Sequence, residues 1–79
     1  MTNLTDTFAA CLRRYRVQAG LSQSALAAAA GVAPGYVSML ECGRRVPPLD
    51  TVETFARALN LGSPLYLLGG VPVEERAAA

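Results

Sequence analysis

Residues 23–41 read QSALAAAAGVAPGYVSMLE, and the pattern of this stretch decides the fold. Leu26 and Ala30 stand four residues apart, on one face of a predicted helix. Gly31 then interrupts the helical pattern where a positive φ is expected, a conformation that costs glycine least. Pro34 can start a second helix, because a proline in the first turn loses no hydrogen bond. The stretch therefore predicts two short helices joined by a tight turn, which is a helix-turn-helix.

The second helix of the motif is expected over residues 34–42. Three of its residues share one side: Val37, Leu40 and Glu41. Gly43 follows the helix and is placed to end it. Ala33 holds the N-cap position, and its methyl group cannot accept a capping hydrogen bond, so we expect a frayed or ligand-assisted start.

A helix is also expected before the motif, over residues 6–19, with Thr5 as its N-cap. The apolar stripe of this helix consists of Phe8, Leu12, Tyr15 and Ala19. Ser22 comes directly before the first motif helix and is expected to cap it.

Two further helices are expected after the motif. The first covers residues 49–59 and ends at Asn60, which suits a left-handed cap. Its inward residues are Leu49, Val52, Phe55, Ala56 and Leu59. Residues 63–68 open with serine and proline and form a short fifth helix. The sequence therefore predicts an all-α domain of five helices over residues 1–70, followed by a tail over residues 71–79.

The motif and its surroundings resemble the phage-repressor helix-turn-helix family, of the Cro and repressor (XRE-like) type. The residues that match are Gly20-Leu21-Ser22-Gln23, Leu26-Ala27, Gly31-Val32, Val37-Ser38, Leu40-Glu41, Gly43-Arg44, Pro47, Leu49 and the Ala-Arg-Ala-Leu of residues 56–59. The resemblance covers roughly residues 8–68. It implies a compact, five-helix, lambda-repressor-like domain with the motif formed by the second and third helices.

The same resemblance implies how DNA is bound. The helix over residues 34–42 would enter the major groove while the preceding helix crosses the backbone. The implied phosphate contacts are Gln23, Tyr36, Arg44, Arg45 and Arg16. The implied base-facing residues are Pro34, Gly35, Ser38 and Met39. Pro34 and Gly35 offer no side-chain donor, so we expect part of the specificity to come from DNA shape.

Two structural roles accompany this assignment. In the resembled family, the residues at the positions of Arg16 and Glu41 form an ion pair that joins the first helix to the recognition helix. Leu65 and Leu68 remain outside after the other residues of the fifth helix face the core. Exposed apolar clusters on small domains usually mark an interface, so these two leucines predict a homodimer.

Composition limits the other classes of function. The 79 residues contain no histidine and two cysteines, Cys11 and Cys42, without metal-ligand spacing. We therefore expect no metal, no cofactor and no enzymatic activity. No small-molecule effector is evident, and regulation by a ligand stays open. A redox role for Cys42 beside Arg44 is an alternative to a plain structural role. No apolar run approaches the length of a membrane span, and residues 1–8 lack the pattern of a signal peptide, so we expect the protein in the cytoplasm. The resemblance implies a prokaryotic or phage protein that acts at the nucleoid.

Net charge leaves two classes of function open. It is only +1, which is low for a protein that neutralises phosphates, although all seven cationic residues are arginines. The first interpretation is a sequence-specific regulator of transcription that binds double-stranded DNA. Among such regulators, a repressor is the favoured role. The alternative is an antitoxin, a restriction-modification controller or a protein-interaction module on the same fold. Gln23, Arg44 and Arg45 favour DNA, because a pure protein binder has no obvious use for them.

Overall fold

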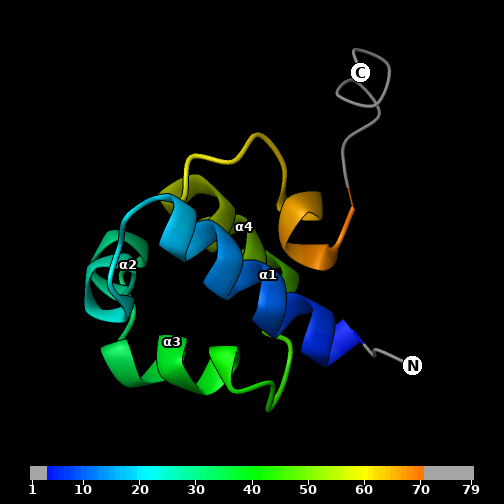
Figure 1. Ribbon diagram of the computed structural model, residues 1–79, viewed down its shortest axis with the longest axis horizontal. Coiled ribbons are helices and arrows are strands. Elements are labelled where there is room, and N and C mark those ends of the chain that lie inside the picture. The colour runs from blue at the N-terminus through cyan, green and yellow to red at the C-terminus, as the bar shows by residue number, and fades with distance from the viewer. Residues whose placement is uncertain (1–3, 71–79) are drawn as a thin grey trace.

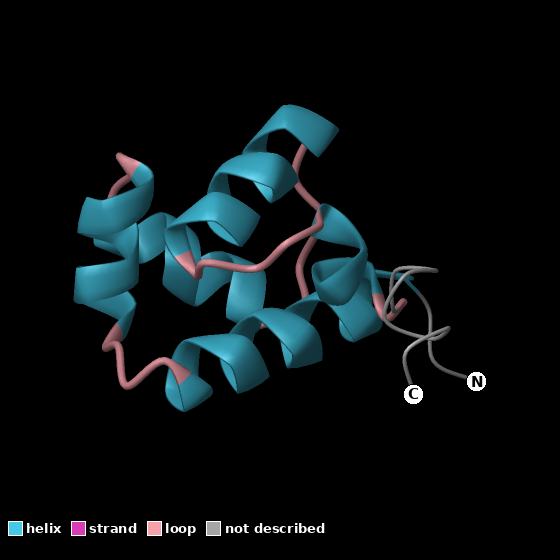
Figure 2. Cartoon of the chain, turned by 90° about the horizontal axis from the view of Figure 1, so that it is seen from above, coloured by secondary structure: helices cyan, strands magenta, loops and turns pink. Residues whose placement is uncertain are grey.

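The helix signals of the sequence are realised in a computed structural model, which describes residues 4–70 (Figures 1 and 2). This part of the chain contains no strand, and it holds four α-helices and one 3-10 helix. Their bounds are α1 Leu4–Gln18, α2 Gln23–Ala30, α3 Pro34–Glu41, α4 Leu49–Ala58 and η1 Pro64–Leu68. The all-α prediction is confirmed. The tail predicted over residues 71–79 lies outside the described residues.

The fifth predicted helix is present as η1, which is a 3-10 helix, so the described residues hold four α-helices and not five. The Ser63 hydroxyl accepts from the backbone N–H of Leu65 at 3.1 Å, and Gly69 ends the segment at φ 87°. Only five residues lie between this cap and this stop. So short a segment favours the tighter i to i+3 pattern that is common in brief connecting helices.

Three predictions about helix ends and faces are also wrong. α1 already includes Leu4, so Thr5 lies inside the helix instead of capping it. Ala19 is exposed, because α1 ends one residue earlier and the chain turns away from the core. Leu49 is 60% exposed, although it heads the inward stripe of α4. The first turn of α4 therefore extends beyond the packed part of the domain.

The core lies where the five elements meet. Its buried residues are Phe8, Leu12, Leu26, Ala27, Val37, Leu40, Val52, Phe55, Ala56, Leu59 and Leu67. Figure 1 shows α1 crossing the middle of the molecule, with α2 at one end, α3 below and η1 near the other end. α3 packs against α2 and α1, and η1 packs against α1 and α4. Burying a leucine or phenylalanine side chain contributes about 1.5–3 kcal/mol, so this shared cluster is the main favourable contribution to the fold.

The turn between α2 and α3 is built as the sequence predicts. Ser22 caps α2, since its hydroxyl accepts from the backbone N–H of Ala25 at 3.0 Å. Gly31 has φ 73° and donates to the carbonyl groups that end α2. Ala33 makes no side-chain cap at the start of α3. Both ends of α2 are therefore capped, whereas the first turn of α3 has no side-chain cap.

Candidate nucleic-acid interface

α3 divides into a buried side and an outward side. Val37 and Leu40 are completely buried and hold the helix on the core. The four residues implied to face bases lie on the other side: Pro34, Gly35, Ser38 and Met39. The first two are exposed and the last two are half-buried. A side chain at Gly35 would meet no atom within 4 Å, so nothing covers this turn of the helix. An outward face of this kind is what a recognition helix requires.

An ion pair fixes the far end of α3. Nε of Arg16 donates to Oε2 of Glu41 at 2.6 Å, and Nη2 donates to Oε1 at 3.1 Å. The two side chains are only 13% and 5% exposed. The hydrogen bond to Glu41 raises the pKa of Arg16 above its ordinary value, with burial opposing the shift. This pair is the contact between the first helix and the recognition helix that the resemblance implies.

The other hydrogen bonds of Arg16 bear on whether it can also contact a DNA phosphate. Its Nη1 donates to the backbone carbonyl of Leu21 at 2.8 Å, in the loop between α1 and α2. Three nitrogen atoms of the guanidinium therefore all bond within the protein. Arg16 was implied to contact both Glu41 and a DNA phosphate, and its geometry favours the structural contact.

Gln23 is the first residue of α2 and points toward the end of α3. Its Nε2 donates to Oε1 of Glu41 at 3.1 Å. This bond joins the helix that is expected to cross the DNA backbone to the helix that is expected to enter the groove. No sequence pattern predicts this bond, because the two residues are 18 positions apart and belong to different helices.

The loop after α3 supplies two exposed arginines, Arg44 and Arg45. Nη2 of Arg45 lies 3.9 Å from the sulfur of Met39, so this guanidinium reaches back to the outward side of α3. Arg45 of the loop and Met39 of the implied base-facing set therefore lie together, which sequence order alone does not establish.

Tyr36 has a mixed environment. Its ring stacks on Phe55 of α4, with a centroid distance of 6.4 Å and an interplanar angle of 26°. The ring thus belongs partly to the core. Its hydroxyl has no hydrogen-bond partner among residues 4–70, so that oxygen is available to a phosphate.

The two leucines predicted at a dimer interface differ in exposure. Leu65 is 46% exposed, whereas Leu68 is half-buried and packs against the core. Tyr66 contacts Tyr15 edge-on, at a centroid distance of 5.8 Å, and Leu67 is completely buried. Of the pair, Leu65 is the one free to meet another surface.

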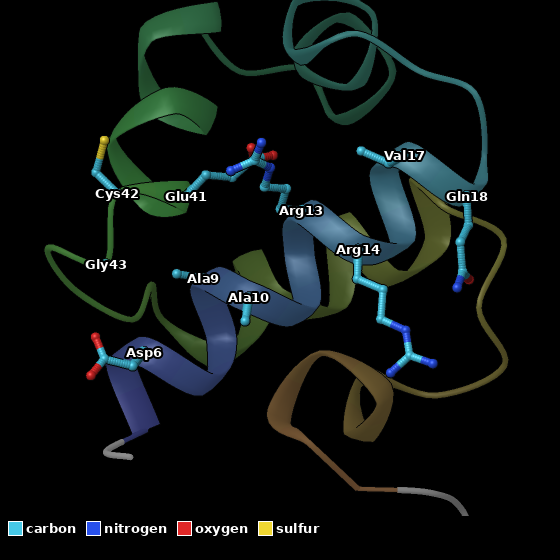
Figure 3. Close-up of a pocket in the computed structure, with 10 residues that line it drawn as sticks. All are labelled: Asp6, Ala9, Ala10, Arg13, Arg14, Val17, Gln18, Glu41, Cys42 and Gly43. Carbon is cyan, nitrogen blue, oxygen red and sulfur yellow. The ribbon is translucent and has the colours of Figure 1, made fainter. Parts of the chain in front are cut away.

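A groove of about 740 Å³ lies along α1 and the end of α3 (Figure 3). Arg13, Arg14 and Val17 line it from α1, and Cys42 lines it from the end of α3. No group of three His, Cys, Asp or Glu side chains that could hold a metal occurs among residues 4–70. Within the same residues, no helix has the length and apolar character to cross a membrane.

A helix-turn-helix domain model matches residues 7–65. The chain belongs to this family of DNA-binding transcription regulators. A helix with an outward side, a tight turn before it and cations in the loop after it are features expected of a helix-turn-helix domain. No curated protein matches the chain.

Three solved structures are similar over most of their length. A hypothetical transcription factor, NHTF, from Neisseria is 34% identical, with a TM-score of 0.79 over 96% of this chain and 84% of that chain. The clp gene regulator ClgR from C. glutamicum is 32% identical, with a TM-score of 0.77 over 84% and 85%. The restriction-modification controller protein C.AhdI from Aeromonas hydrophila is 35% identical, with a TM-score of 0.75 over 80% and 94%. These similar folds are regulators and not enzymes.

Proposed function

We propose that this protein is a sequence-specific transcriptional repressor that binds a pseudo-palindromic operator as a homodimer, with α3 in the major groove. The observation that carries the proposal is the outward side of α3, which is free of core contacts. Arg45 in the following loop, next to the exposed Arg44, reaches Met39 on this side, and Gln23 at the start of α2 bonds to Glu41 at the end of α3. A repressor of this kind works by occupying its operator, and it acts in the cytoplasm, where the chromosome lies.

The chemistry of the outward side suggests how the bases are read. Pro34 and Met39 are apolar and suit the methyl groups of thymine, while the Ser38 hydroxyl can serve a donor or an acceptor edge. Gly35 lets the helix backbone approach the groove floor. Few side-chain hydrogen bonds to bases are available, so phosphate contacts carry most of the affinity and DNA shape carries part of the specificity.

Selection of bound duplexes from a random pool tests this function and returns the site. We expect enrichment of a two-fold symmetric sequence with half-sites about 34 Å apart, one turn of DNA. A pool that shows no enrichment after repeated rounds would contradict the proposal and favour a protein-interaction module on the same fold.

We expect Arg44→Ala to weaken binding to every duplex by a similar factor, because a phosphate contact carries no base information. The slope of log K against log salt should flatten by about one unit, since one fewer counterion is released. Binding titrations at several salt concentrations measure this slope. Arg57→Ala removes an exposed cation from α4 and is the matched control, with an unchanged slope. A change of base preference in Arg44→Ala, with no change of slope, would reverse the assigned role.

We also expect a dimer that depends on Leu65. Two exposed apolar side chains, Leu4 and Leu65, belong to α1 and η1, which pack together. Leu65→Asp should therefore give monomers in sedimentation at tens of micromolar, while the wild type gives dimers. Leu49→Asp changes a leucine on α4 that is even more exposed, and it should leave the dimer intact. A wild-type monomer at these concentrations, with and without DNA, would exclude this arrangement.

The similarity to C.AhdI supports a second candidate role, control of a restriction-modification system. Both roles use the same DNA-binding surface, and the selected operator separates them. An operator that lies before restriction or modification genes would favour the controller.

A further inference from the structure

One carboxylate on α3 receives hydrogen bonds from two other elements. Oε2 of Glu41 accepts from Arg16 at 2.6 Å, and Oε1 accepts from Arg16 and from Gln23, each at 3.1 Å. The Glu41 side chain is 5% exposed, so water competes little for these oxygen atoms. α1, α2 and α3 therefore meet at a single acceptor.

The carboxylate determines which end of the Gln23 amide turns inward. An ionised carboxylate only accepts hydrogen bonds, so it binds the nitrogen and repels the amide oxygen. Nε2 carries two hydrogen atoms, and one of them is directed at Glu41. The other has no partner among residues 4–70 and is left for an external acceptor.

The position of this amide in α2 makes a phosphate the suitable acceptor. Gln23 follows the N-cap Ser22, at the end of the helix where backbone N–H groups favour an anion. A phosphate placed here would not meet a net negative charge, because Arg16 neutralises Glu41 at 2.6 Å. A donor fixed in advance also avoids the entropy cost of ordering a long side chain on binding.

We propose that Glu41 is a positioning residue for DNA, which holds the Gln23 amide in the orientation that donates to a backbone phosphate. The inference rests on the proposed function, since it needs DNA as the ligand. It assigns Glu41 a role beyond the ion pair with Arg16, because the bond to Gln23 is not needed to neutralise either charge.

A double-mutant cycle on a selected duplex tests the proposal. Gln23→Met keeps the length of the side chain and removes the donor. Glu41→Asp keeps the charge and withdraws the carboxylate from Gln23 by one methylene. We expect Gln23→Met to weaken binding roughly tenfold, as for a hydrogen bond to a charged group. We expect Glu41→Asp to weaken it roughly fivefold with Gln23 present and less than about twofold with methionine there.

The cycle separates positioning from a purely structural role. If Glu41 only stabilised the fold, Glu41→Asp would weaken binding by the same factor in both backgrounds, and that result would overturn the proposal. Gln18→Met is the matched control, because Gln18 is exposed on α1. Thermal unfolding of each variant fixes a temperature at which all of them are folded.

A measurement on the wild type needs no variant. Gln18 and Gln23 are the only glutamines in the chain, so NMR should show two glutamine side-chain amide pairs. We expect one Gln23 proton to be shifted downfield and to exchange with water more slowly than those of Gln18. Equal shifts and exchange rates would overturn the proposal. A wild type that binds no selected duplex would instead contradict the proposed function, and the two failures are therefore distinct.

Discussion

Arg16→Ala should lower the free energy of unfolding by about 3 kcal/mol. The substitution removes two of the three hydrogen bonds that Glu41 accepts and the bond to the carbonyl of Leu21. It leaves a carboxylate that is 5% exposed without its cation. The cost comes mainly from this stranded charge, because removing one partner of a buried pair is more destabilising than the pair is stabilising.

Arg13→Ala is the control, since it removes the same side chain from the same helix. Arg13 is exposed and forms no ion pair among residues 4–70, so its loss should stay within about 0.5 kcal/mol. Denaturant midpoints of the two variants, with unchanged slopes, measure the difference. Equal and small effects would mean that water replaces the Arg16–Glu41 contact at little cost.

The helix-turn-helix itself could be predicted from sequence because its signals are local. A serine such as Ser22 caps a helix at its start, and a glycine such as Gly31 adopts a left-handed turn at little cost in any surroundings. Asn60 likewise has φ 58°, as its place after α4 predicts. Each feature depends on a few neighbouring residues, so the motif and its two boundaries follow without knowledge of the rest of the fold.

The wrong predictions concern features that neighbours do not determine. Leu49 has the correct spacing for the inward face of α4, but burial also requires another element beside that turn. Ala19 fails for the same reason at the end of α1. Residues 63–68 are a different case, because the short spacing between cap and stop that favours a 3-10 helix is itself a local feature of the sequence.

The resemblance implies the residues of the candidate site, but it does not imply the contacts between them. The resemblance placed Gln23, Arg44 and Arg45 on one surface by position. It did not imply that Glu41 holds the Gln23 amide, or that Arg45 reaches the sulfur of Met39. These contacts depend on side-chain directions across three elements, which a pattern of residue types does not contain.

The second large effect is expected at Gly69, where η1 meets α1. Gly69 has φ 87°, and a Cβ at this position would lie 2.8 Å from Cγ2 of Thr7. Gly69→Ala should therefore lower the free energy of unfolding by about 3 kcal/mol, from roughly 1–2 kcal/mol of backbone strain and a similar cost of overpacking. Thermal or denaturant unfolding measures this loss.

Two comparisons separate the backbone cost from the steric cost. Gly31 has φ 73° and a Cβ there would meet no atom within 4 Å, so Gly31→Ala should cost about 1–2 kcal/mol from strain alone. Thr7→Ser removes Cγ2, so Gly69→Ala made in that background should fall to the cost of Gly31→Ala. An unchanged cost would show that η1 moves away from α1 to accept the methyl group. That movement would also displace Leu65, so the proposed dimer of the variant would then be weaker than that of the wild type while the variant remained folded.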